Sequence, residues 1–235
     1  MPGSRKTAWG AVAAIVVLAL SACSSEHRAP SPEEVRELAG STDAVQARQE
    51  AEKNLRDVVW AYADRTPLTL GLLVVRDTCL GGPAKQWIDS NGDDLYKIRC
   101  SMQATAYFGA DPKRIVSVLD GILAAGDQTG SGIPFSHDAY QQFIAYYQKP
   151  GKQGAEVPQF SRPSHTLSWD PVRDPRPYLV VKEPDTCPTG KPPMTRCVRE
   201  PESSTVADIR KQHGMVFKLD LHTPEYYKVL KNGRL

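Results

Sequence analysis

The sequence lacks an excess of charge of either sign. Its 235 residues include 29 Lys and Arg against 27 Asp and Glu, which gives a net charge of +2. No block of basic residues marks a surface for nucleic acid or for anionic lipid. We therefore predict no nucleic-acid partner.

The sequence also lacks the spacings that hold metals and cofactors. No two of its five histidines stand at metal-ligand spacing such as His-x-x-x-His, and no Cys-x-x-Cys pair occurs. The histidines are His27, His137, His165, His213 and His222. Gly121 to Gly132 contains four glycines without a Walker lysine or Rossmann spacing. We predict no metal site and no cofactor.

Catalytic motifs are equally absent. There is no Gly-x-Ser-x-Gly elbow and no Ser-x-x-Lys pair. Gly130-Ser131-Gly132 fits a loop, and Asp93 and Asp94 fit turn chemistry. Ser136-His137-Asp138 places three useful side chains in succession, but neighbouring side chains on one element point apart, so we expect Ser136 to be a helix cap. The sequence predicts no catalytic residue, and the site of an enzyme would have to be assembled by the fold from residues distant in sequence.

The longest apolar run, Ala8 to Leu20, is shorter than the roughly 20 residues that span a bilayer. Arg5 and Lys6 precede it, and Leu20-Ser21-Ala22-Cys23 follows it, which is the layout of a secretory signal. The last four residues resemble the lipobox of bacterial lipoproteins. That resemblance implies cleavage before Cys23 and a diacylglycerol on its thiol. The alternatives are an ordinary cleavage site or an uncleaved anchor.

The lipobox resemblance covers only the export signal, and the length of the remaining chain predicts one domain after it. Residues 1–22 would be the signal peptide, 23–30 a lipidated cysteine with a polar tether, and 31–235 a single domain. Only two charged residues, both basic, leave with the signal, so the mature chain would carry 27 charges of each sign. We expect a protein held by lipid on the extracytoplasmic face of the cell membrane.

Four cysteines remain beyond Cys23. An even number in an exported domain indicates two disulfides, and of the three possible pairings we favour the local ones, Cys79–Cys100 and Cys187–Cys197. A zinc site is the rival, but the spacing and an oxidising compartment argue against it.

Helical patterns occupy several parts of the chain. Ser31, Pro32 and Glu34 predict a capped helix that Gly40 interrupts and that resumes from about Asp43 to Arg65. Further helices are expected from Asp111 to a stop at Gly126 and from Thr205 to Gln212. Residues 137–148 fit a helix or a strand, and we favour the helix.

Strand patterns surround these helices. Leu68 to Val75 is short and apolar, whereas Tyr96 to Phe108 alternates strictly between apolar and polar residues, which predicts one dry and one wet face. Met215 to His222 alternates likewise, and we expect a turn at Thr223-Pro224-Glu225 with a returning strand to Leu230. The order of elements predicts an α+β fold whose antiparallel sheet has helices packed on one face.

Proline is concentrated in one region. Pro150 to Pro201 holds 11 of the 19 prolines, with one strand-like island at Tyr178 to Lys182. We interpret this region as a proline-rich loop excursion that the Cys187–Cys197 disulfide cross-links.

Tyrosines offer the remaining functional signal. Six of them could form a recognition surface or pack into the core: Tyr140, Tyr146, Tyr147, Tyr178, Tyr226 and Tyr227. Our leading hypothesis is a non-catalytic envelope protein that binds another protein or a cell-wall component. An envelope hydrolase and a small-ligand-binding lipoprotein are the alternatives.

Overall fold

The computed structural model describes residues 28–83, 96–149, 156–173, 176–187 and 194–231. Within these ranges the chain forms five α-helices, a short 3-10 helix and six strands. In chain order they are α1 (Pro32–Ala39), α2 (Thr42–Arg65), β1 (Thr69–Gly81), β2 (Tyr96–Ala110), η2 (Pro112–Arg114), α3 (Ile115–Asp127), α4 (His137–Gln148), β3 (Gln159–Arg162), β4 (His165–Trp169), β5 (Met194–Glu200), α5 (Val206–His213) and β6 (Met215–Leu230). The predicted α+β class is confirmed.

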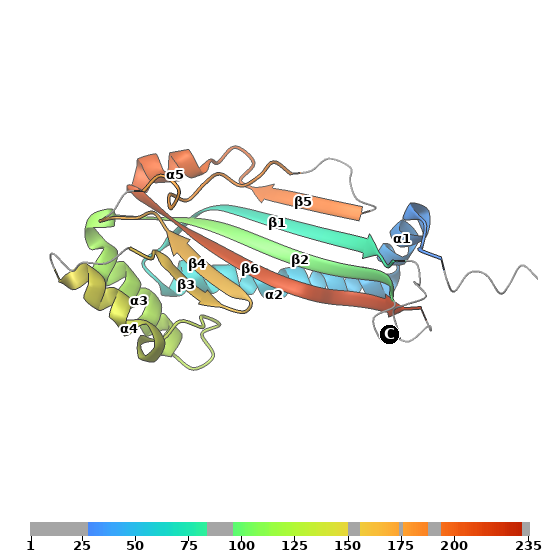
Figure 1. Cartoon of the computed structure of the whole chain (residues 1–235), viewed down its shortest axis with the longest axis horizontal. Coiled ribbons are helices and arrows are strands. Elements are labelled where there is room, and N and C mark those ends of the chain that lie inside the picture. Colours follow the sequence, from blue (N-terminus) through green and yellow to red (C-terminus); the bar gives the residue numbers. More distant parts are fainter. Residues whose placement is uncertain (1–27, 84–95, 150–155, 174–175, 188–193, 232–235) are drawn as a thin grey trace, which may run out of the picture.

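The described strands form one antiparallel sheet in the order β3-β4-β6-β2-β1-β5. β2 lies between the other two long strands, β1 and β6 (Figure 1). α2 runs along the sheet, and α3 and α4 lie together at one end of the molecule (Figure 1). α1 lies at the opposite end, close to where β6 finishes.

The first two helices begin where the sequence predicts. The Ser31 hydroxyl accepts from the backbone N–H of Glu34, and the Glu34 carboxylate accepts from the backbone N–H of Ser31, which completes the predicted capping box. Gly40 ends α1, and the Ser41 hydroxyl caps the start of α2. α2 stops at Arg65, immediately before Thr66-Pro67, as expected.

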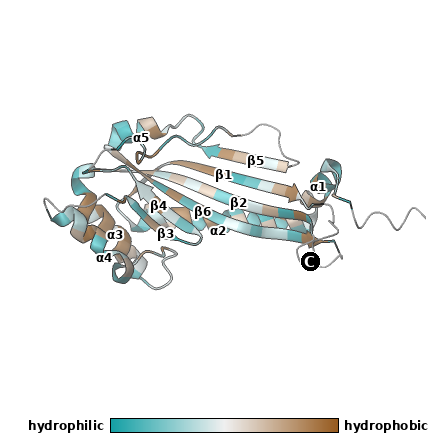
Figure 2. Ribbon diagram, in the orientation of Figure 1, coloured by the Kyte–Doolittle hydropathy of each residue, from teal (hydrophilic) through white to brown (hydrophobic). Residues whose placement is uncertain are grey.

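The main core lies between one face of the sheet and helices α2, α3 and α4. Hydrophobic residues alternate with polar ones along β2 (Figure 2). The hydrophobic set packs with residues of these helices in one core cluster. Val59 and Tyr62 from α2 and Leu119 and Ile122 from α3 are fully buried against Phe108 and its neighbours. Burying one such side chain stabilises the fold by about 1.5–3 kcal/mol.

The other face of the sheet is covered only in part. Val206 and Ile209 of α5 pack there in a small cluster with Leu72, Val74, Tyr107, Val181 and Val216. Ile209 sits directly over Gly71, where an added Cβ would come within 2.6 Å of its side chain. Helices therefore cover one face broadly, as predicted, while α5 covers a corner of the other. We call this second face the open face.

Both predicted disulfides are present. Cys79 and Cys100 are directly paired across β1 and β2, with 4.1 Å between their Cα atoms. Cys187 and Cys197 join an irregular segment of the proline-rich region to β5 in the same region, with 5.5 Å between their Cα atoms. The first bond closes the β1–β2 end of the sheet, and the second fixes a loop beside its edge.

β1 is longer than the sequence predicts. The predicted strand ends at Val75 because Arg76 and Asp77 follow it, but β1 continues to Gly81. Asp77 points to the helix-covered face, where it is 1% exposed and pairs with Arg48 of α2. An ion pair brought in by a distant helix allows a charged residue to continue the buried strand.

The proline-rich region contains more sheet than predicted. β3, β4 and β5 all lie between Pro150 and Pro201, whereas the strand-like island at Tyr178 to Lys182 forms no strand. The backbone of Val181 explains the error: its N–H donates to the Asp170 carboxylate and its carbonyl accepts from Arg210. Side chains thus take the place of a partner strand.

The predicted final hairpin is a single strand. Thr223 pairs with Met102 and Tyr227 with Cys100, so the three residues between them form a bulge opposite one residue of β2. Pro224 is tolerated there because β4 pairs only with Phe217 to Leu221, which leaves the rest of β6 at an edge. The expected turn is wrong because a bulge accommodates the same residues.

The helices after β2 occur where the sequence predicts them and differ from the prediction at their ends. Residues 137–148 form α4, which confirms the helix over the strand. α3 continues through Gly126 to Asp127 instead of stopping at the glycine. A Cβ at Gly126 would lie 1.9 Å from the backbone oxygen of Phe135, so the glycine serves a close approach rather than a helix end.

Candidate functional site

His137 belongs to a charge cluster that the sequence did not reveal. Its two ring nitrogens contact the carboxylates of Asp127 and Asp120, both on α3, and not Ser136 or Asp138. The hydrogen bond that His137 donates to the Asp127 carboxylate raises the pKa of His137 and lowers the pKa of Asp127. Ser136 occupies the N-cap position of α4, but its side chain makes no capping bond. The cluster joins α3 to α4.

Two serines, Ser131 and Ser164, make side-chain hydrogen bonds that bear on a catalytic role. Ser131 is buried in the predicted loop, where its hydroxyl bonds the backbone of Ile133. The Ser164 hydroxyl lies 2.8 Å from Nδ1 of His165, and burial lowers the pKa of that histidine. The other ring nitrogen, Nε2, is buried and meets no carboxylate among the described residues. A catalytic triad needs that third group to orient the base.

The remaining histidines and paired acids are dispersed. His213 ends α5 against Gly109, and His222 is exposed on β6. His27, Asp93 and Asp94 lie outside the described ranges, as does Cys23. No group of three or more His, Cys, Asp or Glu side chains in the described part of the chain could hold a metal ion.

The six tyrosines do not form one surface. Tyr140 and Tyr147 are buried; the Tyr147 hydroxyl donates to Glu156 and accepts from Trp169. Tyr226 and Tyr227 lie on the last part of β6, with the Tyr226 hydroxyl bonded to Asp77. Tyr178 is 66% exposed. The aromatic recognition surface expected from the sequence is therefore reduced to individual rings.

A polar groove crosses the open face of the sheet. Residues 178–185, which we call the strap, pass over this face and enclose a groove of about 600 Å³. The floor comes from four strands and combines charged, hydroxyl and amide groups: Val74, Arg76, Gln103, Thr105, Tyr107, Ser168, Lys218 and Asp220. Ligand sites are typically hollows with a few convergent polar groups, which makes the groove the principal candidate.

A partly buried ion pair anchors the middle of the strap. The Asp170 carboxylate accepts from Nε of Arg210 at 2.8 Å and from the backbone N–H groups of Val181 and Val216, each at 2.9 Å. Arg210 also donates to the Val181 carbonyl at 2.7 Å. Asp170 is only 7% exposed, so its charge depends on these donors.

Further contacts hold the strap along its length. Arg76 donates to the backbone carbonyl of Asp185 at 2.6 Å, and the Glu183 carboxylate accepts from the backbone N–H of Ala207 at 3.0 Å. The disulfide from Cys187 to β5 follows directly. The groove is thus built by side-chain contacts to three elements and does not depend on regular structure in the strap.

The charges on the groove floor are already paired. Asp220 accepts from the Thr105 hydroxyl at 3.0 Å and lies 2.8 Å from the Lys218 ammonium. Arg76 lies 3.9 Å from the Asp185 carboxylate on the strap. Because these pairs compensate one another, the floor presents polar groups without a strong field of either sign.

Tyr107 differs from the other floor residues. It is 2% exposed and its ring packs beside Val181, yet it lines the groove. Its hydroxyl makes no hydrogen bond with any part of the chain that the structure describes. A hydroxyl without a partner costs about 1–3 kcal/mol where water cannot reach it, so water or a ligand in the groove must supply the bond. Burial, and next Asp220, raise its pKa and keep it protonated.

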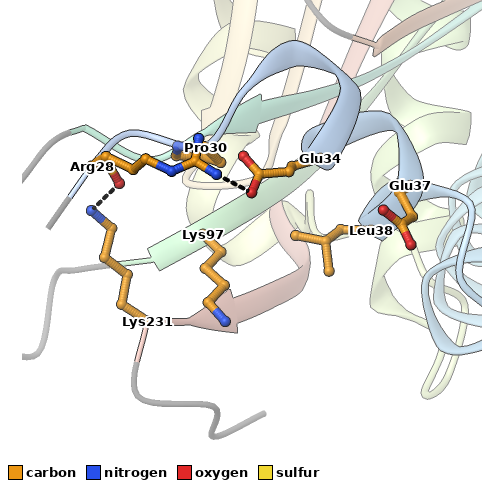
Figure 3. Close-up of a pocket in the computed structure, with 7 residues that line it drawn as sticks. All are labelled: Arg28, Pro30, Glu34, Glu37, Leu38, Lys97 and Lys231. Carbon is orange, nitrogen blue, oxygen red and sulfur yellow. Dashed lines mark hydrogen bonds and ion pairs between the residues drawn. The ribbon is translucent and has the colours of Figure 1, made fainter. Parts of the chain in front are cut away.

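A second hollow of about 460 Å³ lies at the α1 end of the molecule. Figure 3 shows Arg28, Lys97 and Lys231 around it with Glu34 and Glu37 of α1. Most of these charges have structural partners: Arg28 bonds Glu34 at 2.7 Å, and the Lys231 ammonium donates to the backbone carbonyl of Arg28 at 3.3 Å. The residues around this hollow therefore connect the first described residues of the chain to the last.

Comparison with other proteins adds no assignment. No protein-family model, no curated protein and no solved structure matches the chain. No helix in the described ranges is long and apolar enough to cross a membrane. The assignment of a class therefore rests on the fold and its groove: an α+β domain with one open sheet face, bridged by a strap.

The sequence held part of the signal for the groove. Thr105 and Tyr107 belong to the predicted wet face of β2, and Lys218 and Asp220 to the polar face of the last strand. Alternation places such residues on one face but does not say that the two faces are neighbours. The strap was missed because its contacts are with single side chains far away in the sequence.

Proposed function

We propose that this protein is an exported lipoprotein, held on the extracytoplasmic face of the membrane by lipid on Cys23, that binds an envelope component in the groove without catalysing a reaction on it. The groove itself is the observation that carries the proposal. It combines a formed hollow, a floor on which charged side chains lie in pairs, and one tyrosine hydroxyl that has no hydrogen-bond partner in the described ranges.

The short tether determines which end of the domain a lipid on Cys23 would hold. Cys23 precedes Arg28 by five residues, so even a fully extended chain would keep the lipid within about 18 Å of Arg28. Arg28 lies at the α1 end of the molecule (Figure 3). Lipid on Cys23 would therefore bring this end close to the bilayer.

The position of the groove supports the binding part. Ile98 packs under α1, and Tyr107 follows nine residues later on the same strand, a distance of roughly 30 Å along β2. A domain anchored at the α1 end would carry the groove away from the lipid surface. The groove would then be open to wall components and to other envelope proteins.

Site-specific photocrosslinking in intact cells tests both parts. A photoreactive phenylalanine would replace Lys182 on the strap and, as the control, Glu50 on the exposed side of α2. We expect an adduct from position 182 and none from position 50, with both proteins in the membrane fraction. Equal labelling from the two positions would contradict a site in the groove.

The anchor has a separate test. The Cys23→Ala variant cannot carry the lipid. It should leave the washed membrane fraction, because stable anchoring requires acyl chains. Full retention of this variant would contradict anchoring through Cys23 and would leave the crosslinking result intact.

A further inference from the structure

We propose that the groove binds an uncharged oligosaccharide, with the Tyr107 hydroxyl as a contact on the floor and the Tyr178 ring as a stacking surface at the rim. This inference rests on the proposed function, because it names the ligand class of the same groove. Charge, hydrogen-bonding capacity, aromatic exposure and length each support it.

The charges favour a ligand without net charge. Three cationic and three acidic side chains line the groove: Arg76, Lys182, Lys218, Glu183, Asp185 and Asp220. Lys218 is paired with Asp220, and Arg76 faces Asp185. Lys182 on the strap has no such partner among the described residues, but a charged ligand that reached the floor would have to break one of these two pairs. Neutral hydroxyl groups can bond to paired charges without separating them.

Tyr107 has the hydrogen-bonding capacity that a sugar requires. A phenol hydroxyl both donates and accepts, as does each hydroxyl of a saccharide. Tyr107 lines the groove and its hydroxyl has no partner in the described ranges, whereas Thr105 on the same strand is bonded to Asp220. A ligand hydroxyl would satisfy Tyr107 without displacing any protein contact.

Tyr178 supplies a fixed aromatic ring. It is 66% exposed at the groove, and its hydroxyl accepts from the Arg176 guanidinium at 2.6 Å. Arg176 is in turn bonded to the backbone carbonyl of Glu156, so the ring is held from a buried position. An exposed, immobilised ring can stack on the apolar face of a sugar at a low entropic cost.

The length of the groove favours several sugar units. Its floor crosses β1, β2, β6 and β4, which are successive neighbours in the sheet, so it spans roughly 15 Å. One monosaccharide would fill only part of that span. The site therefore suits a chain of sugars lying across the strands.

Calorimetric titration of the full-length protein in detergent tests the inference. The probes are neutral tetrasaccharides of glucose, mannose and N-acetylglucosamine, with tetragalacturonate as the matched anionic control. We expect saturable binding of at least one neutral probe and at least about tenfold weaker binding of the anionic one. Binding of none of the neutral probes, or tighter binding of the anionic probe, would overturn the inference.

Variants locate the binding in the groove. Tyr107→Phe and Tyr178→Ala should each weaken the neutral probe by about tenfold, whereas Tyr226→Phe, outside the groove, should leave affinity unchanged. Wild-type affinity in Tyr107→Phe would overturn the assignment. If no sugar binds but position 182 still crosslinks a partner, the ligand class fails and the proposed function stands.

Discussion

The two faces of the sheet use their buried polar side chains differently. On the helix-covered face, Asp77 accepts from Nε of Arg48 and from the Tyr226 hydroxyl, both at 2.6 Å, so its capacity is used inside the protein. On the open face, Tyr107 is equally buried but its hydroxyl has no partner in the described part of the chain. The first arrangement stabilises the fold, and the second leaves a group available to a ligand.

Burial without a partner does not by itself distinguish the faces. The Tyr62 hydroxyl, on the helix-covered side, is also buried and unpaired. It lines neither of the two hollows, whereas Tyr107 lines the groove. The comparison shows that unused hydrogen-bonding capacity indicates function only where a ligand can reach it.

The largest expected effect comes from the carboxylates of the two faces. Asp77→Ala would leave Arg48, whose side chain is 11% exposed, without its partner, and we expect a loss of about 3–5 kcal/mol in the free energy of unfolding. Asp220→Ala removes a pair that water already reaches, and we expect a loss of about 1 kcal/mol or less. Urea denaturation of both variants measures the difference.

A double-mutant cycle provides the control. If Asp77 and Arg48 act as a pair, Arg48→Ala should cost much less in the Asp77→Ala background than alone. Additive losses, or equal losses for Asp77→Ala and Asp220→Ala, would remove the distinction between the faces.

The disulfides should separate stability from binding. Replacing both Cys79 and Cys100 by Ala opens a link with a sequence separation of 21, and we expect a loss of about 3 kcal/mol with the strap unaffected. Replacing Cys187 and Cys197 opens a link of separation 10 beside the strap, where we expect a somewhat smaller loss but faster amide hydrogen exchange at Val181. Unchanged exchange there would show that the hydrogen bonds and ion pairs of the strap hold it without the disulfide.

Much of the fold follows from local patterns in the sequence. Ser31 and Glu34 start α1 through contacts within one helical turn, and alternation from Tyr96 identifies β2 and its two faces. The pairing of Cys79 with Cys100 follows from two strands joined as neighbours. These features were predictable because the residues that determine them are close in the chain or share one period.

The failures share the opposite property. Asp77 continues β1 only because Arg48 arrives from α2, and Val181 is held by Asp170 and Arg210 rather than by a strand. The sequence did not show whether Tyr226 packs inside the protein or at its surface, because Asp77, which bonds its hydroxyl, lies far away in the chain. Long-range side-chain contacts leave no periodic pattern, so the groove that depends on them was not predictable.

Tyr226 and Tyr107 allow the comparison of the two sheet faces to be tested by removing one hydroxyl group at a time. Tyr226→Phe removes a hydrogen bond to a buried carboxylate, and we expect a loss of about 1.5–3 kcal/mol in unfolding free energy. Tyr107→Phe removes a hydroxyl without a protein partner, so its unfolding free energy should stay within about 0.5 kcal/mol of wild type. A large loss for Tyr107→Phe would reveal a structural role and weaken its assignment to ligand binding.

The smallest expected effect is on pH dependence and comes from His137. Its pKa is raised above the ordinary value of 6.5 chiefly by the hydrogen bond that it donates to Asp127. Its stabilising contribution is therefore complete below that ordinary value and is lost as pH rises through the folded-state pKa. The pKa of Asp127 is lowered, so its contribution is lost only in acid. The melting temperature of wild type should therefore exceed that of His137→Gln near pH 6 and approach it near pH 9.

Ligand binding should not follow this dependence. Burial raises the pKa of Tyr107, so its hydroxyl stays protonated over the range in which His137 titrates. Affinity in the groove should then be constant while stability declines slightly, because the titrating cluster joins α3 to α4 and lines neither hollow. An affinity that fell together with the melting temperature would mean that the groove depends on the α3–α4 end of the helix-covered side, and that the two faces are coupled rather than independent.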